Sequence, residues 1–546
     1  MSNSQYKRAA AIESAVKIQR EFWMNKRSIL DLCVSGQAFG PFQAKKEGHN
    51  KTVYELQGDT TQIVSLGEEG VNILSTKGEF VGQGKTTATG LTTEYILPDK
   101  FFLAKQHVFS KKVDYDSLPI WPDYSKIRHP AGIANIPSKY IDGLDNAAAA
   151  AIKGVAAGNY LFGVKGPPGT GKTTLIGRVT AYMAGELGMK ICILANAHKA
   201  VDEALASIAN SRTKFGLQFE IIKKTTRTAQ FKSSPLSKTC SLWNTKEYEL
   251  DQTKGYVVGG VLASTYPADK FDLVIIDEAG QIPVFVGAKV SPLAPKFAFF
   301  GDDSQLPPIL EAQHEPKVKA SCLSALMAND PTGTHVVELE VTHRLPSALA
   351  NVVGKFFYPS TAFRSSEQNR DSHFQAPQNW PTKENLGFVS ISNQESTNSN
   401  MEEVTTVEHL IKSLIGAQAA FDQKKQIISA SDIAVLTPFK VQERLLTKSL
   451  KPLGVETVGT VDIMQGQSKA IVIFCITATN PQYMATCAQW LFEPNRINVG
   501  ISRAKAGCYL VCNPDSISTA LPTSALGVSR LETFKRIMSC FQNKNS

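Results

Sequence analysis

The chain contains 546 residues, of which 42% are apolar and 20% are charged, and its formal net charge is +9. This length predicts about three or four domain-sized units, and the composition is that of an ordinary soluble globular chain that can build several cores. The excess of basic side chains suits a polyanionic partner, although net charge alone does not identify one.

The nine cysteines show no C-x2-C pair, so the sequence indicates neither a zinc ribbon nor a disulfide framework. Most of them lie in apolar runs, where a buried free thiol is expected. These thiols favour a reducing compartment, and we therefore expect a cytoplasmic protein that carries no zinc. The N-terminus lacks an apolar signal region, and no stretch reaches about 18 apolar residues, so neither a signal peptide nor a membrane span is expected.

The N-terminal part is expected to contain two small units. Residues 1–48 should form a basic helical segment, because apolar side chains recur there at helical spacing with Lys and Arg around them. This helix would be a packing helix or a basic arm. In residues 49–112, short alternating segments separated by turns predict a small β-barrel or meander. Residues 113–140 contain four prolines and are expected to be a connector.

From residue 141 onward, apolar strands alternate with helical patterns, which implies parallel sheets in an α/β fold. The Asp-Pro-Thr-Gly sequence at 330–333 divides this region into two blocks, 141–335 and 336–546. Residues 212–255 are rich in lysine and are expected to form an insertion, either one that faces nucleic acid or a solvated basic loop. Strands are predicted at 161–164, 191–195, 273–276, 297–300, 433–437, 471–476 and 508–512, and helices at 145–156, 173–187 and 199–209.

The sequence Gly166–Thr173, GPPGTGKT, lies between a predicted strand and a predicted helix, as a phosphate-binding loop requires. Its glycines let backbone N–H groups turn toward a phosphate, and the helix N-terminus adds partial positive charge. Lys172 is expected to reach the β- and γ-phosphates, and the Thr173 hydroxyl to bind Mg²⁺. A second GKT sequence at 84–86 has Glu79 where the first glycine belongs, so it predicts no phosphate site. The predicted nucleotide-binding residues of the loop are Gly166, Pro167, Pro168, Gly169, Thr170, Gly171, Lys172, Thr173 and Thr174.

Further charged and polar residues are expected to gather beside this loop. Asp277 and Glu278 follow an apolar strand, whose end should lie at the same edge of the sheet. Asp277 would bind Mg²⁺, and Glu278 would polarise the attacking water. Gln305 follows the next strand and could hydrogen-bond both the γ-phosphate and that water. In the second block, Arg344 and Arg503 supply guanidinium groups that can stabilise charge on the γ-phosphoryl group.

Eight segments, in this order, resemble the successive motifs of superfamily 1 helicases. The resemblance is greatest to the 1B subgroup that contains the nonsense-mediated-decay RNA helicase and the nidovirus replicative helicases. It covers residues 144–512, about two thirds of the chain, and residues 195–205 are especially similar to the nidoviral version. The segments are GPPGTGKT, ANAHKAVDEAL (195–205), IIDEAGQ, GDDSQLPP, THRLPSAL, VLTPF (435–439), GTVDIMQGQ (459–467) and NRINVGISRAK (495–505).

The resemblance implies two tandem RecA-like P-loop domains that clamp a nucleotide between them while single-stranded nucleic acid crosses both. It implies that the β-barrel corresponds to the accessory 1B domain, and that His343 and Gly466 contact the nucleotide. By position, the nucleotide-hydrolysing set would be Lys172, Thr173, Asp277, Glu278, Gln305, Arg344 and Arg503. The residues facing the nucleic-acid strand would be His198, Ser264, Thr265, Thr437 and Pro438.

Three positions depart from the family pattern. Ala148 stands where relatives have a glutamine that reads the adenine edge, and Ser468 where they have a glutamate near the ribose. His343 stands where many have an aromatic ring stacked on the base, and imidazole stacks less extensively. These changes weaken recognition of base and sugar but leave the phosphate chemistry intact. We therefore expect a competent hydrolase with a loose nucleotide preference.

The sequence thus predicts a helicase that hydrolyses ATP or another NTP with Mg²⁺, moves 5′ to 3′ on single-stranded RNA or DNA, and unwinds duplexes. Its compactness and its nidovirus-like segment associate it with viral or mobile-element replication, where replication-complex proteins are possible partners. Two alternatives stay open: a translocase that displaces proteins without unwinding, and a nucleic-acid-binding scaffold with a relic motor.

Overall fold

The computed structural model describes residues 38–46, 53–57, 70–75, 80–86, 90–93, 97, 100–105, 135–157, 160–245, 250, 253–267, 270–288, 290–308, 320–330, 333–464 and 466–542. The helix expected near the N-terminus and most of the connector lie outside these residues. The chain divides into two compact units. One comprises residues 1–122, 283–292 and 308–320, and the other comprises residues 123–282, 293–307 and 321–546.

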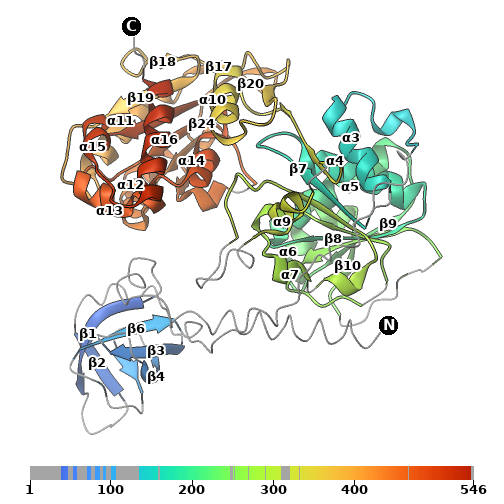
Figure 1. Cartoon of the computed structure of the whole chain (residues 1–546), viewed down its shortest axis with the longest axis horizontal. Helices are drawn as coiled ribbons and strands as arrows, with labels where there is room; N and C mark the ends of the chain where they lie inside the picture. The colour runs from blue at the N-terminus through green and yellow to red at the C-terminus, as the bar shows by residue number, and fades with distance from the viewer. Residues whose placement is uncertain are drawn as a thin grey trace. The chain divides into compact units, whose positions relative to one another are not determined.

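The first unit contains a closed antiparallel barrel, drawn in blue in Figure 1, with strand order β1-β2-β5-β4-β3-β6. Its interior is apolar and follows the period of two that strands impose, as in Val71 and Ile73 on one strand and Phe101 and Leu103 on another. The strands are β1 (Ala38–Lys46), β2 (Val53–Gln57), β3 (Gly70–Ser75), β4 (Phe80–Thr86), β5 (Gly90–Thr92) and β6 (Phe101–Lys105).

The barrel begins earlier than the sequence suggested. Strand β1 lies within residues 1–48, which we expected to be helical, and it pairs with both β2 and β6. Gly40 and Pro41 within this strand disfavour a helix, and the pairing with β6 shifts register between Phe39 and Phe42. The predicted helical segment therefore does not include residues 38–46.

The second unit contains two parallel sheets, the first of which has eight strands in the order β10-β9-β11-β8-β12-β13-β7-β14. All its strand pairs are parallel, and the central β12 is buried along its whole length, as expected for a strand covered by helices on both faces. Figure 1 shows this sheet in teal to green with its helices. The strands are β7 (Leu161–Lys165), β8 (Lys190–Ala195), β9 (Glu220–Lys224), β10 (Ser241–Trp243), β11 (Tyr256–Val261), β12 (Leu273–Ile276), β13 (Phe297–Gly301) and β14 (Val336–Glu338).

Helices alternate with strands along this part of the chain. Helix α3 (Asn146–Ala156) starts at an Asp145 N-cap, whose carboxylate accepts from the Ala148 amide at 3.0 Å. The other helices are α4 (Lys172–Gly185), α5 (His198–Lys214), α6 (Thr228–Ser233) and α9 (Cys322–Ala328), whereas α7 (Val284–Ala288) belongs to the first unit.

The second sheet, shown in yellow to red in Figure 1, has the order β18-β19-β25-β24-β22-β23. Only the edge pair β18–β19 is antiparallel. Its strands are β18 (Thr382–Lys383), β19 (Leu386–Ser390), β22 (Ile433–Leu436), β23 (Thr457–Gly459), β24 (Lys469–Cys475) and β25 (Ala504–Cys512). Its helices are α10 (Ser347–Phe357), α11 (Met401–Leu414), α12 (Lys440–Leu450), α13 (Pro481–Leu491), α14 (Pro494–Ile501), α15 (Pro514–Thr519) and α16 (Ala525–Phe541).

Two small sheets accompany it. One pairs β15 (Val341–Thr342) with β16 (Arg364–Ser365), and the other has the order β17 (His373–Phe374), β20 (Gln418–Phe421), β21 (Lys424–Ile427). The chain is thus an α/β protein with two parallel, RecA-like sheets.

Two expectations about this unit are wrong. Residues 212–255 are not a loop-like insertion, because they contain β9 and β10, which extend the first sheet. The boundary at residue 335 is also misplaced, because β14 pairs with β7 and belongs to the first sheet. The first half therefore continues to Glu338, and the second begins at Val341 after only two residues.

The cysteines of the described ranges are all free, and most are buried. Among those same residues, no helix combines the length and the apolar character that a bilayer crossing needs.

Candidate nucleotide site

The loop between β7 and α4 has the backbone of a phosphate cradle. Gly169 and Gly171 have φ angles of +75° and +82°, which glycine adopts without a steric penalty. The Thr170 hydroxyl donates to the Pro167 carbonyl at 2.8 Å and fixes the turn. The Lys172 ammonium donates to the Gly166 carbonyl, so the lysine lies folded across the loop.

Strand β12 delivers two carboxylates beside this loop. Asp277 is buried, and its Oδ1 accepts from the Glu278 amide at 2.9 Å. Burial, with the Glu278 carboxylate next to it, raises the pKa of Asp277 to about 7. Glu278 itself has a φ of +55°, an uncommon conformation for a non-glycine residue. Its side chain accepts from Gln281 Nε2 at 3.1 Å.

These residues fit a divalent cation. Burial and the Glu278 carboxylate raise the pKa of Asp277 by more than the Lys172 ammonium lowers it, so a further cation would stabilise the ionised carboxylate. The Thr173 hydroxyl at the start of α4 is a second oxygen donor. Within the described ranges, no group of three or more His, Cys, Asp or Glu side chains could hold a metal ion. Because Mg²⁺ often binds through one or two protein oxygens together with phosphates, this site would take the metal with a nucleotide.

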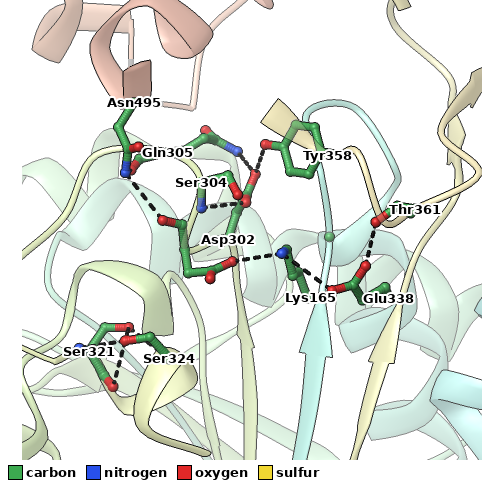
Figure 2. A network of polar contacts seen from close by, with 12 residues as sticks. Lys165, Asp302, Ser304, Gln305, Ser321, Ser324, Glu338, Tyr358, Thr361 and Asn495 are labelled. Atoms are coloured by element: carbon green, nitrogen blue, oxygen red, sulfur yellow. Dashed lines mark hydrogen bonds and ion pairs between the residues drawn. The ribbon is translucent and has the colours of Figure 1, made fainter. Parts of the chain in front are cut away.

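The turn after β13 carries a buried polar network that Figure 2 shows. The Asp302 carboxylate accepts from Gln305 Nε2, from the Ser304 amide at 3.1 Å and from the Tyr358 hydroxyl at 2.6 Å. Gln305 Oε1 in turn accepts from Arg503 Nη2 at 2.7 Å. Gln305 from the first half and Arg503 from the second are therefore in direct contact.

The second half also contacts the phosphate loop through residues 342–344. The Thr342 hydroxyl donates to the Pro168 carbonyl at 2.8 Å, and the His343 amide donates to the Gly169 carbonyl at 2.8 Å. Arg344 follows and donates to the Ser502 carbonyl at 3.4 Å. Burial and the nearby Arg503 cation lower the pKa of Arg344 to about 9, so its side chain stays charged at neutral pH.

Both halves line one cavity of about 310 Å³. This is the volume range of small-molecule sites in proteins. The predicted Glu278, Gln305, Arg344 and Arg503 meet there with six residues of the loop. The lining residues are Pro168, Gly169, Thr170, Gly171, Lys172, Thr173, Glu203, Glu278, Gln305, His343, Arg344, Asp422, Gly466, Arg503 and Lys505.

Four of the predicted residues do not line the cavity. Gly166 and Pro167 are buried in the loop, and Asp277 is buried next to Glu278. Thr174 is exposed on α4 and does not reach the cavity.

Three lining residues were missed by the sequence reasoning. Glu203, on α5, faces Gly466, and burial raises its pKa. Lys505 forms an ion pair with Asp422, which lies in the turn between β20 and β21. Glu203 and Lys505 belong to segments that resemble helicase motifs, whereas nothing in the sequence around Asp422 indicates a site.

The chain is similar to known proteins along most of its length. Two family models match it, both described as an AAA domain, one over residues 143–347 and the other over 318–515. It is 25% identical over 435 residues to the DNA replication ATP-dependent helicase/nuclease of Schizosaccharomyces pombe, covering 75% of this chain and 30% of that protein. It is 24% identical over 427 residues to the Regulator of nonsense transcripts 1 homolog of Neurospora crassa, covering 67% and 37%. The chain belongs to the superfamily 1 helicases.

The Gly166–Thr173 sequence of the chain has the P-loop pattern expected in this superfamily. The chain spans about a third of the length of the curated relatives it matches. Among solved structures it is similar to arterivirus nonstructural protein 10 (helicase), at a TM-score of 0.36 and 13% identity over 81% of this chain and 76% of that one. A complex of that helicase with DNA has a TM-score of 0.35 at 14% identity, over 89% and 80%.

The residues predicted to face nucleic acid follow the carboxyl ends of three strands of this helicase. His198 follows β8, Ser264 and Thr265 follow β11, and Thr437 and Pro438 follow β22. Thr437 is fully buried, and its hydroxyl bonds the Thr477 hydroxyl at 2.9 Å. Its side chain is therefore not available to a nucleic-acid strand, which corrects that prediction for the side chain. The other four contacts stay predictions.

The departures from the family pattern can also be located. Ala148 is buried in the core of the first half on α3 and does not line the cavity, and neither does Ser468. His343 does line the cavity and is exposed. Neither of the two substituted base- and sugar-reading positions therefore reaches the nucleotide site.

Proposed function

We propose that this superfamily 1 helicase is a motor that hydrolyses nucleoside triphosphates to move 5′ to 3′ along single-stranded nucleic acid and to unwind duplexes. One observation carries the proposal: Lys172, Glu278 and Gln305 of the first half share a cavity with Arg344 and Arg503 of the second. Hydrolysis at a site built from two halves can change the position of one half relative to the other. That change can move a bound strand.

The residues of the chain divide the chemical work. Lys172 would leave the Gly166 carbonyl and bind the β- and γ-phosphates, with the loop amides around them. Thr173 and Asp277 would hold Mg²⁺, which would neutralise part of the phosphate charge. Glu278 would orient the attacking water. Arg344 and Arg503 would bind the γ-phosphoryl oxygens and stabilise the charge that develops on them.

The same residues would couple hydrolysis to movement. A triphosphate draws Arg344 and Arg503 toward the first half, and loss of the γ-phosphate releases them. Alternation between these states would advance the strand. We place the strand along the carboxyl ends of the sheets, near His198, Ser264, Thr265 and Pro438, and we assign the barrel as an accessory domain of the 1B kind.

RNA and DNA are both candidate tracks. The relatives named above are a DNA replication helicase/nuclease and a regulator of nonsense transcripts. The nidovirus-like segment 195–205 supports a proposed role in viral or mobile-element replication. Motors that track a sugar-phosphate backbone read the bases little, so the choice between the two depends on contacts with the 2′-hydroxyl.

Phosphate release from NTP, with and without single-stranded RNA or DNA, tests the proposal. We expect one of the two nucleic acids to stimulate hydrolysis, and Lys172→Ala to abolish it. Lys85→Ala is the matched control, because Lys85 is the exposed lysine of the second GKT sequence, and it should hydrolyse NTP like the wild type.

The two alternative functions, a translocase without unwinding and a nucleic-acid-binding scaffold, predict different results. Strand separation of a labelled duplex distinguishes a helicase from a translocase that only displaces proteins. A wild type whose hydrolysis equals that of Lys172→Ala in all conditions, while still binding nucleic acid, would overturn the motor and support the scaffold.

A further inference from the structure

We propose that Tyr358 is a positioning residue for hydrolysis: its hydroxyl holds Asp302, and Asp302 sets the orientation of the Gln305 amide at the nucleotide cavity. The proposal rests on the proposed function, because it assigns Tyr358 to the same reaction. Tyr358 is the C-cap of α10 and lies outside every motif that the sequence suggested.

The direction of each hydrogen bond around Tyr358 is fixed. Its side chain is 1% exposed, and its hydroxyl lies 2.6 Å from Asp302 Oδ2 and 2.8 Å from Asn498 Nδ2. The same Asn498 nitrogen lies 2.7 Å from the Ser304 carbonyl, which can only accept, so this nitrogen must be the donor. Because Asn498 donates to the Tyr358 oxygen, the single hydroxyl proton points to Asp302. Figure 2 draws this contact between Tyr358 and Asp302.

Asp302 then determines which way the Gln305 amide faces. Its Oδ2 accepts from Gln305 Nε2 as well as from Tyr358. The other end of the amide, Oε1, faces Arg503 Nη2 at 2.7 Å, and a guanidinium can only donate. A flipped amide would place its NH₂ group against the arginine and its oxygen against the carboxylate. Both contacts would be repulsive, so the amide has one orientation as long as Asp302 is held.

The hydroxyl also closes a ring of contacts between the two halves. Ser304 donates its amide to Asp302 Oδ1 at 3.1 Å, and its carbonyl accepts from Asn498 Nδ2 at 2.7 Å. Asn498 lies on α14, the helix that ends just before Arg503. Tyr358 therefore links the turn that carries Gln305 to the helix that leads to the arginine bonded to Gln305.

The ring of Tyr358 has a separate packing role. It lies 5.5 Å from the Phe363 ring and 5.8 Å from the Lys165 ammonium, which is ion-paired with Asp303 at 3.1 Å and with Glu338 at 3.3 Å. Phenylalanine at this position would keep the ring and its packing. Tyr358→Phe therefore removes the hydroxyl and its two hydrogen bonds alone.

Steady-state hydrolysis tests the proposal in four proteins: wild type, Tyr358→Phe, Gln305→Ala and the double variant. We expect Tyr358→Phe to lower the nucleic-acid-stimulated kcat about tenfold, as for loss of one hydrogen bond to a charged group, with KM for NTP within about twofold of wild type. In the Gln305→Ala background the same change should have no further effect, because Tyr358 acts through Gln305.

Tyr256→Phe is the matched control. Tyr256 is also buried, and its hydroxyl donates to the Lys270 carbonyl at 2.6 Å away from the cavity, so its loss should leave kcat unchanged. A Tyr358→Phe variant with wild-type kcat, or effects that multiply in the double variant, would overturn the proposal. If the wild type hydrolysed no NTP, the proposed function would fail, and urea unfolding of the same four proteins would decide the coupling. Additive shifts of the unfolding midpoint would then overturn it.

Discussion

Arg503 is a buried arginine in which one N–H donor has no acceptor among the described residues. Its side chain is 5% exposed, and Nε has no hydrogen-bond partner among the residues that the structure describes. Burial lowers its pKa, and the Glu278 carboxylate opposes that shift. A buried donor without an acceptor destabilises the protein, and a phosphate oxygen in the cavity would supply the acceptor. This unmet donor is consistent with the phosphate-binding role proposed for Arg503.

The first prediction follows from the shape of this group. Arg503→Lys keeps the charge but removes the planar fork that reaches both Gln305 and a phosphate. We expect kcat to fall at least about a hundredfold, a moderate loss for an arginine that stabilises phosphoryl transfer. Steady-state hydrolysis at saturating NTP measures it. Arg496→Lys on the same segment is the control, since Arg496 pairs with Glu493 outside the cavity and should stay within about twofold of wild type.

A second prediction concerns Gly169, which combines a φ of +75° with close contact to the second half. A Cβ there would lie 2.6 Å from Thr342 Oγ1, a distance that forces a shift. Gly143 has the same φ of +75°, but a Cβ added to it would meet nothing within 4 Å, so Gly143→Ala reports the backbone strain alone. In urea unfolding we expect Gly143→Ala to cost about 1 kcal/mol and Gly169→Ala at least about 2 kcal/mol more. Equal losses of unfolding free energy in the two variants would contradict the close contact between Gly169 and Thr342.

Much of the site was predictable from single residues and short motifs, because phosphate binding requires particular residue types at fixed spacing. The loop and Glu278 follow from residue type and spacing, and Gln305 and both arginines follow from the resemblance to helicase motifs. The structure places them around one cavity. Tyr358 and Asp422 were not predictable. Each reaches the site through a turn or helix end whose position depends on the folded chain, and neither has a local pattern.

At the scale of elements, a buried carboxylate connects two helices to the end of a strand. Glu403 on α11 is completely buried and accepts from Gln442 Nε2 on α12 at 2.7 Å. It also accepts from the Thr477 amide and hydroxyl, both at 2.8 Å. Thr477 follows β24 with a φ of +66°, which is rare for a β-branched residue. Glu403 therefore holds a strained turn at the carboxyl edge of the second sheet.

The third prediction is a pH dependence of stability. Burial raises the pKa of Glu403 from 4.5 to about 7. The unfolded chain loses this proton near the lower value and the folded chain near the higher one. The group therefore stabilises the fold below about pH 4.5, and its contribution declines as the pH rises to about 7, by about 3 kcal/mol in total. Glu403→Gln should remove this slope in urea unfolding at about pH 5 and about pH 8.

Glu402→Gln is the control for that comparison. Glu402 is the neighbouring residue, and hydrogen bonds from Ser392 and Asn393 outweigh its burial and lower its pKa. Its contribution is therefore lost only below its ordinary pKa and should not change between about pH 5 and about pH 8. Parallel pH profiles for the wild type and Glu403→Gln would contradict the prediction.

There is a physical reason why the sequence did not predict strands β9 and β10. Strand β9 reads as a basic surface because it ends in Lys223 and Lys224. In the fold, Lys223 is buried against Asp202 at 2.7 Å, and the Lys224 ammonium lies 3.4 Å from the centre of the Trp243 ring on β10. Both charges are satisfied by partners distant in sequence. The apolar strands β7, β8, β12 and β13 were predictable because their burial needs no such partner.

At the scale of the whole molecule, the nucleotide site is dominated by groups that bind phosphate. The family position for reading adenine is Ala148, buried in α3 outside the cavity, and the position near the ribose is Ser468, which also lies outside it. We therefore predict that kcat/KM for ATP, GTP, CTP and UTP agrees within about tenfold, since loss of base contacts removes discrimination. Hydrolysis assays with each NTP measure it, and strict ATP specificity would contradict the prediction.

The short passage from β14 to β15 has a consequence for anyone who divides this protein into fragments. Val336–Glu338 covers the edge of β7, and the buried Leu339 donates its amide to the Lys165 carbonyl at 2.8 Å. A first-half fragment cut at residue 335 would leave the edge of β7 open to pairing with other chains and prone to aggregate. A cut after Glu340 retains the edge strand, and it falls immediately before the segment that contacts the phosphate loop. This cut therefore divides the residues that line the cavity between the two fragments, so neither fragment alone holds the complete site.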